Sequence, residues 1–300
     1  MNRKKIICIT SKDCIKENDN RQTYKWFYDC QDIFDVQLWG LGFNETTIID
    51  LQNKIDSFKP DYIYATGRHK YSRYNYITHK MDEKCWVPDL TNIKVPKIFV
   101  EVDTQKWDVN DSWYEQFDKV MCREPSWNGW GSVPLFRWSV PAKMIVSNSC
   151  ALNKKRKGVI FLGHIKKKAY YNDKLINDVY KEREEIYKRY KSVIQFKKTS
   201  GKEYWKKMYN ASAVLCPGGS VFGKFTPMRL FECLATGAAI ITNCDLDMAG
   251  IPEAKGSVIV YRNIKHLNKK LKIDFSKYYN KTINIAKNHT HKIRYQEIFI

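Results

Sequence analysis

The sequence lacks any long hydrophobic run. No stretch approaches the roughly 20 consecutive apolar residues that a membrane-spanning helix requires. The basic start, MNRKKIICITSKD, contains only about five apolar residues, too few for the core of a signal peptide. We therefore expect a cytoplasmic chain without a membrane span.

Paired cysteines are also missing. The nine cysteines are scattered, their number is odd, and no Cys-x-x-Cys pair occurs. This pattern favours reduced thiols over a disulfide framework or a structural zinc site. No cluster of His, Cys and carboxylate residues has metal-ligand spacing, so we expect no metal.

Acidic residues are few relative to basic ones. Lys and Arg number 52 against 32 for Asp and Glu, which gives a net charge of +20. The many Lys, Asn, Ile and Tyr residues suggest an AT-rich coding genome, which raises the lysine content without any selection for function. An excess of this size also favours an anionic partner, such as nucleic acid, an anionic polymer or an acidic membrane surface. Both interpretations stay open at this point.

The length and the hydrophobic pattern predict two α/β domains. The 300 residues are 43% hydrophobic, enough for two domains with cores of their own. Short apolar runs alternate with helical patterns, which predicts βαβ units and largely parallel sheets. The boundary is expected in 141–157, where the apolar periodicity is lost. We place the first domain at 1–145, the second at 146–277 and a C-terminal helix that returns to the first domain at 278–300.

The expected elements follow from these runs. Strands are predicted at 5–10, 36–39, 61–65, 97–102 and 119–122 in the first domain, and at 159–162, 192–196, 213–216, 239–242 and 258–261 in the second. Helices are predicted at 21–30, 46–58, 175–190, 203–210, 227–236, 263–271 and 278–300.

The segment 213–242 is a strand, a glycine-rich loop, a helix and a second strand. The loop contains Gly218 and Gly219, and Thr226 precedes a proline in the usual arrangement of a helix start. In the mostly apolar helix, Arg229, Glu232 and Thr236 share one narrow face. One interpretation is an Arg229–Glu232 pair on a solvated edge. The other is a ligand site in which the loop, the helix start and Arg229 hold an anion while Glu232 accepts hydrogen bonds from hydroxyl groups.

The helix also carries a motif. Arg-x-Phe-Glu-x-x-Ala-x-Gly, from Arg229 to Gly237, resembles the signature of the CgeB-type (spore-maturation-protein-like) glycosyltransferases of the GT-B superfold. FLG at 161–163, YRNIKHL at 261–267 and HTHKIRY at 289–295 follow in the same order. The resemblance covers the C-terminal half, and in the N-terminal half it is limited to 95–103.

The resemblance implies a GT-B enzyme with two Rossmann-like domains facing across a cleft. The second domain would hold a nucleotide sugar, with a UDP-sugar as the expected donor and no other cofactor. The matching glutamate, Glu232, would hold the ribose, and Arg229 with a lysine near Lys166 would stabilise the departing diphosphate. Related retaining enzymes carry a second glutamate, and its position here holds Lys224. The residues expected in the donor site are Glu232, Arg229, Gly218, Gly219, Thr226, His164 and Lys166.

Two strand ends of the first domain carry candidate acceptor-site residues. The strand at 61–65 is followed by a segment in which basic and aromatic residues interleave, which suits phosphates and bases. The alternative for this segment is a solvated, tyrosine-rich helix. Asp103 follows the strand at 97–102 and is a candidate general base, with an N-cap or turn aspartate as the alternative. The catalytic candidates are Asp103, His69 and Arg229, and the acceptor-binding candidates are Arg68, Lys70, Tyr71, Arg73 and Tyr74.

The net charge directs the expectation about the acceptor. An anionic polymer accounts best for +20, and the favoured case is DNA that bears a hydroxymethylated base, as for phage-type DNA glycosyltransferases acting in a host cytoplasm. A cell- or spore-surface glycan is the second possibility. A non-catalytic nucleic-acid-binding protein on a GT-B scaffold is the third.

Overall fold

The computed structural model describes two compact units. It covers residues 3–10, 26–40, 43, 47–67, 70–75, 80–85, 87–101, 108–123, 129–153, 155–163, 165, 169–171, 174–176, 181–197, 199, 201–218 and 228–300. The first unit contains the described residues up to Phe136 together with Gln296–Ile300, and the second contains Arg137–Tyr295. In the described chain the two units divide between Phe136 and Arg137.

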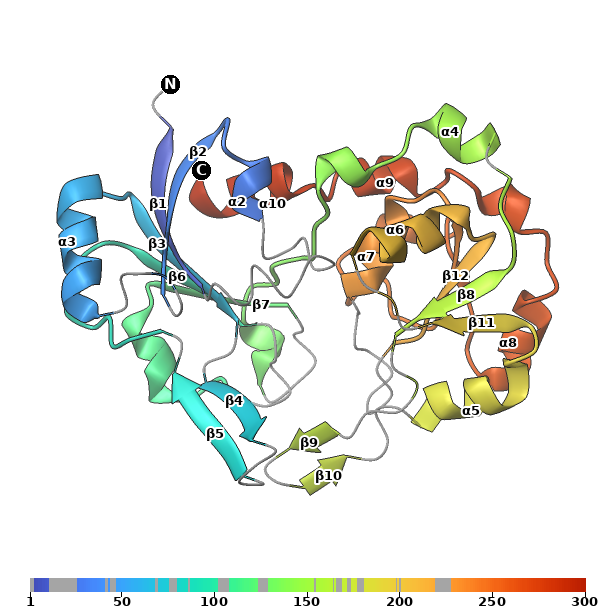
Figure 1. The fold of residues 1–300 in the computed structure, drawn as a ribbon, viewed down its shortest axis with the longest axis horizontal. Coiled ribbons are helices and arrows are strands. Elements are labelled where there is room, and N and C mark those ends of the chain that lie inside the picture. The colour runs from blue at the N-terminus through green and yellow to red at the C-terminus, as the bar shows by residue number, and fades with distance from the viewer. Residues whose placement is uncertain are drawn as a thin grey trace. The chain divides into compact units, whose positions relative to one another are not determined.

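The first unit is built on a five-stranded parallel sheet with the order β2-β1-β3-β6-β7 (Figure 1). Ile6 pairs with Val36 on one side and with Tyr62 on the other. These five strands are the ones expected from the apolar runs. Their bounds are β1 (Lys4–Ile9), β2 (Phe34–Trp39), β3 (Tyr62–Gly67), β6 (Lys97–Glu101) and β7 (Lys119–Cys122).

Helices cover both faces of this sheet. Ile7 and Ile63 belong to one core cluster with the buried side of α3 (Ile48–Phe58). Alternate strand residues face the other way. There the Tyr64 ring lies 5.5 Å from that of Trp26 in α2 (Trp26–Asp29) and 5.7 Å from that of Phe299. Burial on both faces explains why the inner strands of the sheet, such as β6, are rich in apolar residues.

The start of α3 is set by a capping box. Thr47 Oγ1 accepts a hydrogen bond from the Asp50 amide at 3.1 Å, and Asp50 Oδ2 accepts one from the Thr47 amide at 3.0 Å. This reciprocal pair satisfies two amides that have no partner inside the helix. The sequence predicts a helix start near Thr46, whereas the capping residue is Thr47.

The second unit contains another five-stranded parallel sheet, with the order β11-β8-β12-β13-β14 (Figure 1). Its strands are β8 (Val159–Leu162), β11 (Ile194–Lys197), β12 (Ala213–Cys216), β13 (Ala239–Thr242) and β14 (Ile259–Val260). The helices α5 (Lys181–Tyr190), α6 (Gly201–Asn210), α7 (Met228–Leu234) and α8 (Ile264–Lys270) pack around it. The predicted α/β organisation of this half is confirmed.

Helices cover both faces of the second sheet as well. Ile186 of α5 and Leu267 of α8 belong to the core cluster on one face. On the other face Cys233 of α7 lies with its Sγ 3.4 Å from Sγ of Cys216 and 3.7 Å from Sδ of Met208 in α6. The helices α6 and α7 are therefore packed against one another and against β12.

Two pairs of antiparallel strands occupy segments for which a helix was considered or expected. β4 (Lys70–Asn75) pairs with β5 (Lys80–Cys85), and β9 (Ala169–Tyr171) pairs with β10 (Lys174–Ile176). Their backbone alone is described. The tyrosine-rich helix considered for the first segment is wrong, because its aromatic residues favour a strand and the partner strand supplies hydrogen bonds. Of the helix expected over 175–190, Leu175 and Ile176 belong to β10 instead, and the described helix is α5, from Lys181.

The C-terminal segment is broken into short elements rather than the single helix expected from Tyr278. They are η8 (Phe275–Tyr278), α9 (Ile283–Lys287) and α10 (His291–Phe299). Asn280 adopts a φ of 60°, which interrupts a right-handed helix. At the end of α10 the Phe299 ring packs 5.3 Å from that of Phe34 in the first unit.

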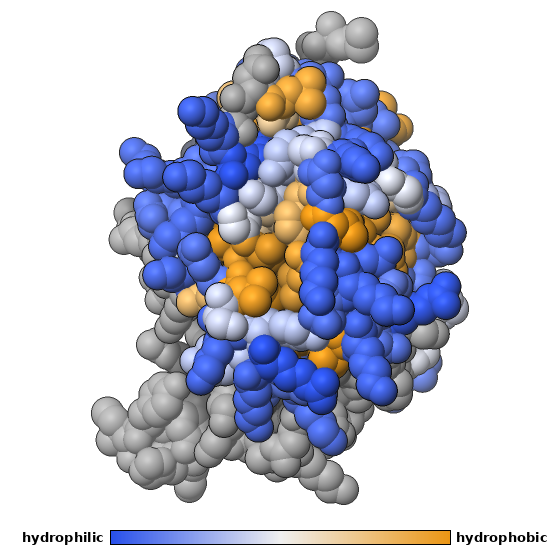
Figure 2. Space-filling model, turned by 90° about the vertical axis from the view of Figure 1, so that its right-hand side faces the viewer, coloured by the Kyte–Doolittle hydropathy of each residue, from blue (hydrophilic) through white to orange (hydrophobic). Residues whose placement is uncertain are grey.

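The remaining described elements are short. They are η3 (Ser112–Gln116), η4 (Trp130–Ser132), η5 (Ala142–Met144), α4 (Asn148–Asn153) and η7 (Pro252–Ala254). Figure 2 views the side of the second unit and shows a hydrophobic area bordered by hydrophilic residues, so this face is mixed in spite of the net charge. Among the helices of the described ranges, none has the length and apolar character needed to span a membrane.

Candidate functional site in the second unit

Polar and glycine residues follow the strands of the second sheet. Gly163 comes directly after β8, Gly218 lies two residues after β12, and Asn243 comes directly after β13. Because the strands are parallel, these residues lie at one edge of the sheet. Open α/β sheets bind their ligands at this carboxyl edge.

The helix α7 carries the two residues that the sequence analysis singled out. It ends before Gly237, whose φ is 66° and where a β-carbon would lie 2.6 Å from Cβ of Ala151, so glycine is required. Glu232 is 4% exposed and Thr236 is 0% exposed. Two of the three polar residues of this face are therefore buried, and the interpretation of an Arg229–Glu232 pair on a solvated edge is wrong.

The guanidinium of Arg229 lies at the carboxyl end of β8. A β-carbon on Gly163 would lie 2.7 Å from its Nη2, and its Cζ lies 5.4 Å from the centroid of the Phe161 ring, within cation–π range. Within the residues that the structure describes, no carboxylate forms an ion pair with this guanidinium. The edge of the sheet thus presents a partly buried positive charge.

The carboxylate of Glu232 is held by a tyrosine from the neighbouring helix. Tyr204 Oη of α6 donates a buried hydrogen bond of 2.6 Å to Glu232 Oε2. Burial and the adjoining carboxylate raise the pKa of Tyr204 well above its ordinary value, and the nearby charge of Arg229 opposes that rise only in part. The hydroxyl therefore keeps its proton and acts as the donor.

A second set of hydrogen bonds anchors the loop that follows β12. The Gly218 amide donates to Asn243 Oδ1 at 2.7 Å, and Asn243 Nδ2 donates to the two carboxylate oxygens of Glu182 at 3.1 and 2.9 Å. Burial raises the pKa of Glu182, while the neighbouring Tyr261 and Asn243 lower it in part. The first turn of α5 and the end of β13 together fix the start of the glycine-rich loop.

A cluster of three residues, His289, Arg294 and Glu253, lies next to Phe231 of α7. His289 Nδ1 is 2.9 Å from Nη2 of Arg294, and its Nε2 is 2.9 Å from Oε1 of Glu253. A guanidinium only donates, so Nδ1 is the acceptor and Nε2–H donates to Glu253. Burial, assisted by the charge of Arg294, lowers the pKa of His289 against the opposing effect of Glu253. The ring, 5.4 Å from that of Phe231, is therefore neutral near pH 7.

In the first unit the strand end at β6 holds a buried carboxylate. Glu101 is fully buried, and its Oε2 accepts a hydrogen bond of 2.9 Å from Tyr114 Oη. Asp103, the predicted base, lies outside the described residues, as does His69. Their catalytic roles stay predictions.

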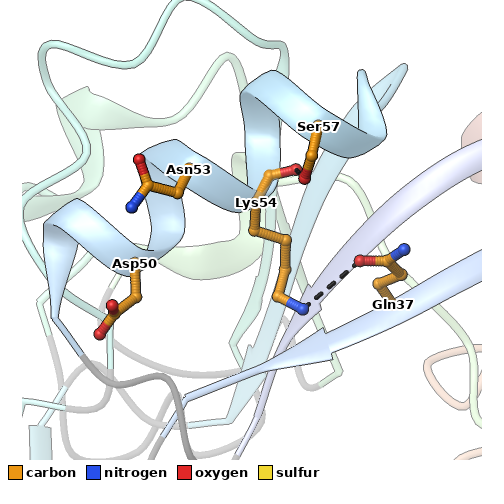
Figure 3. A pocket seen from close by; sticks show the side chains of 5 residues that line it. All are labelled: Gln37, Asp50, Asn53, Lys54 and Ser57. Atoms are coloured by element: carbon orange, nitrogen blue, oxygen red, sulfur yellow. Dashed lines mark hydrogen bonds between the residues drawn. The ribbon is translucent and has the colours of Figure 1, made fainter.

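The first unit also has a polar hollow of about 370 Å³. Its lining comes from α3 and β2, and Figure 3 shows Lys54 pointing across it to Gln37, with Nζ 3.4 Å from Oε1. The lining residues are Gln37, Asp50, Asn53, Lys54 and Ser57. None of the predicted site residues is among them.

Three predicted donor-site residues lie at the carboxyl edge of the second sheet: Gly218, Arg229 and Glu232. Four others, Gly219, Thr226, His164 and Lys166, lie outside the described residues. Of the predicted acceptor residues, Lys70, Tyr71, Arg73 and Tyr74 lie on β4, where the backbone alone is described, and Arg68 lies outside.

Sequence reasoning missed Tyr204, Asn243 and Glu182. Tyr204 belongs to a buried stripe of α6 that has the pattern of an ordinary core, so its sequence gives no sign of the contact. Asn243 had a usable signal, because it is a polar residue directly after a buried strand. In the described part of the chain, no group of three or more His, Cys, Asp or Glu residues is placed to hold a metal ion.

Two parallel five-stranded sheets with helices on both faces are the architecture of the GT-B fold. The structure is similar to that of AviGT4, a glycosyltransferase involved in avilamycin A biosynthesis, with a TM-score of 0.57 and 11% identity over 99% of this chain and 96% of that one. Sucrose-phosphate synthase from Thermosynechococcus elongatus matches with a TM-score of 0.48 and 10% identity over 99% and 95%. UDP-GlcNAc 2-epimerase from Neisseria meningitidis, bound to UDP-GlcNAc, matches with a TM-score of 0.47 and 10% identity over 98% of each chain.

The similarity to AviGT4, together with the two five-stranded parallel sheets, establishes the fold. The likeness to AviGT4, at 11% identity, carries no information on substrates, and the two lower TM-scores add no argument. No protein-family model matches the sequence, and no curated protein sequence matches it either. The chain therefore has the predicted GT-B fold, while membership of the CgeB-type family stays a prediction.

Proposed function

We propose that the protein is a glycosyltransferase of the CgeB type that takes a sugar from a nucleotide-sugar donor, with a UDP-sugar as the first candidate. The observation that carries the proposal is the Arg229 guanidinium, which lies against Gly163 without an ion-paired carboxylate among the described residues. A partly buried cation at the carboxyl edge of a parallel sheet suits a diphosphate. Glu232, buried on the same helix, would accept hydrogen bonds from the ribose hydroxyls.

The chemistry follows from these positions. The bond between the anomeric carbon and the β-phosphate oxygen breaks, and the acceptor oxygen bonds to that carbon while its proton passes to a base. Negative charge develops on the departing diphosphate, where Arg229, the loop amides and a lysine near Lys166 would stabilise it. Asp103 of the first unit is the proposed base.

For the acceptor we propose an anionic polymer, with DNA bearing a hydroxymethylated base as the favoured case. The net charge of +20 is the support for this part. A base inside a duplex would have to be flipped out to present its hydroxyl, at a cost of a few kcal/mol. A surface glycan is the other acceptor that the same enzyme would serve.

The test is a ligand panel measured on the whole chain. UDP, GDP and their sugars are scored for a rise in melting temperature and for donor hydrolysis, with and without DNA. A ligand at 100 times its dissociation constant adds about 2.7 kcal/mol to the free energy of unfolding. Hydrolysis of one donor, lost in Arg229→Ala, supports the proposal. If no nucleotide stabilises the protein while DNA does, the non-catalytic nucleic-acid-binding alternative replaces it.

A further inference from the structure

The contact between α6 and α7 places one hydroxyl beside both charged groups of the candidate donor site. Tyr204 Oη is 2.6 Å from Glu232 Oε2, and the charge of Arg229 acts on the same hydroxyl. Tyr204 is 7% exposed and Glu232 is 4% exposed, so water does not compete freely for this bond. Tyr204 is thus placed to affect what the carboxylate binds.

The tyrosine is itself held rigidly. Its ring stands at 90° to that of Trp205, with centroids 6.1 Å apart, and Met208 one turn further on touches Cys233 next to Glu232. The fixed hydroxyl of Tyr204 restricts rotation of the Glu232 carboxylate about its Cγ–Cδ bond. The hydrogen bond to Oε2 keeps good geometry in only one orientation of the carboxylate. The carboxylate is therefore oriented before a ligand arrives, which reduces the ordering cost on binding.

We propose that Tyr204 is a positioning residue that sets the preference of this site for ribose over 2′-deoxyribose. The inference rests on the proposed function, in which Glu232 accepts hydrogen bonds from ribose hydroxyls. A carboxylate held by Tyr204 presents its oxygens to a ligand in one orientation. A 2′-deoxyribonucleotide lacks one hydroxyl donor and leaves such an acceptor unmatched, which is where a site discriminates most strongly.

The test compares two nucleotides on two variants of one helix. Dissociation constants of UDP and 2′-deoxy-UDP, and of GDP and 2′-deoxy-GDP, are measured by calorimetry for the parent, Tyr204→Phe and Tyr209→Phe. Tyr209 is the matched control, because it also donates its hydroxyl from α6, but to the carbonyl oxygen of Met144 and away from Glu232. We expect the parent to prefer the ribonucleotide about 10- to 150-fold.

The expected result is a change in the ratio of the dissociation constants for the deoxyribonucleotide and the ribonucleotide, not a general loss of binding. Tyr204→Phe lowers the ribose preference about 3- to 10-fold and leaves the affinity for the deoxynucleotide within about twofold, while Tyr209→Phe keeps the parent ratio. In the double variant with Glu232→Ala, the Tyr204→Phe change has no further effect on the ratio, because the group that it positions is absent.

The outcomes separate this inference from the proposed function. A parent ratio retained in Tyr204→Phe overturns the inference alone, since the nucleotide still binds. A parent that binds none of the four nucleotides overturns the proposed function and the inference with it. If Tyr204→Phe does not fold, Tyr204→Leu, which also removes the hydroxyl, is measured in its place: a ratio equal to that of the parent overturns the inference, and a ratio lowered about 3- to 10-fold supports it.

Discussion

The guanidinium of Arg229 touches the backbone of Gly163 so closely that a β-carbon at residue 163 would lie 2.7 Å from Nη2 and 3.2 Å from Cζ. The two residues are far apart in the sequence and meet where β8 ends. The contact limits how closely the guanidinium can approach the end of β8. The proposed phosphate site therefore depends on a glycine that has no chemistry of its own.

Gly163→Ala should displace Arg229 and lower donor turnover. The added methyl group overlaps the guanidinium, so the charge must move by several tenths of an ångström, and a misplacement of that kind costs about 10-fold or more in rate. Donor hydrolysis measures the effect. The control is Gly256→Ala, a glycine with a φ of 78° around which a β-carbon meets nothing within 4 Å. Equal turnover in both variants would show that the contact does not position the charge.

Arg229 itself should act mainly on the leaving group. Arg229→Ala is expected to lower kcat about 100-fold or more, because the charge of the departing diphosphate is no longer matched. Arg229→Lys should restore activity only in part, since an ammonium lacks the planar fork of donors. Steady-state kinetics with a fixed donor distinguishes these cases. Full activity in Arg229→Ala would move the phosphate site elsewhere, with Lys166–Lys168 as the next candidates.

Glu232→Gln should weaken donor binding without unfolding the protein. Loss of charge-assisted hydrogen bonds to ribose costs roughly 1.5–3 kcal/mol, or about 10- to 150-fold in the dissociation constant. The amide oxygen can still accept the hydrogen bond of Tyr204, so we expect a melting temperature close to that of the parent. Calorimetry and thermal unfolding check the two parts. Donor binding at the parent affinity would remove Glu232 from the site.

Much of the fold could be predicted because the strands are buried on both faces. The inner strands, such as β6 (KIFVE), β12 (AVLC) and β13 (AIIT), lie in apolar runs that stand out from their surroundings. Gly237 predicted the end of α7 for a local reason, its positive φ. The motif around Arg229 and Glu232 could be identified from the sequence because charged residues are rare in a buried helix.

Other features depend on contacts that are distant in the sequence. The Tyr204–Glu232 bond joins residues 28 apart, and the Asn243–Glu182 bonds join residues 61 apart, so no local pattern announces them. The C-terminal tail looked like one helix because its isoleucines recur among polar residues. Its break at Asn280 depends on a left-handed backbone that the sequence permits but does not require.

The cluster of His289, Arg294 and Glu253 should make stability fall in mild acid. His289 is buried and its pKa is lowered, whereas the unfolded chain takes up a proton near the ordinary histidine value of 6.5. The unfolded state then binds more protons, so the free energy of unfolding decreases as the pH drops below about 6.5, by at most about 1.4 kcal/mol per pH unit. We expect His289→Gln to flatten this dependence in melting temperatures taken between about pH 7.5 and pH 5.5.

The control for this prediction is His266→Gln. His266 lies on α8 and is partly exposed, so its replacement removes one imidazole outside the buried group. Glu253, the partner of His289, also has a lowered pKa, but its titration falls below about pH 4.5 and outside the window. A slope in His289→Gln equal to that of the parent would show that the buried imidazole does not couple protonation to folding.

The net charge leads to the last prediction, which concerns DNA. If DNA is the acceptor, its phosphates are neutralised by basic residues of the first unit, and the affinity falls with salt at a log–log slope of about −0.9 per phosphate contacted. Changing Arg68, Lys70 and Arg73 to Gln should flatten that slope by up to about 3 units and leave nucleotide binding unchanged.

The control changes Lys265, Lys269 and Lys272, three exposed lysines on or just after α8, to Gln. It removes an equal number of positive charges from the second unit. A flattening in the control alone would place DNA on the second unit. If neither duplex nor single-stranded DNA binds at about 50 mM salt, the charge reflects coding bias and solubility, and a surface glycan becomes the acceptor of the same enzyme.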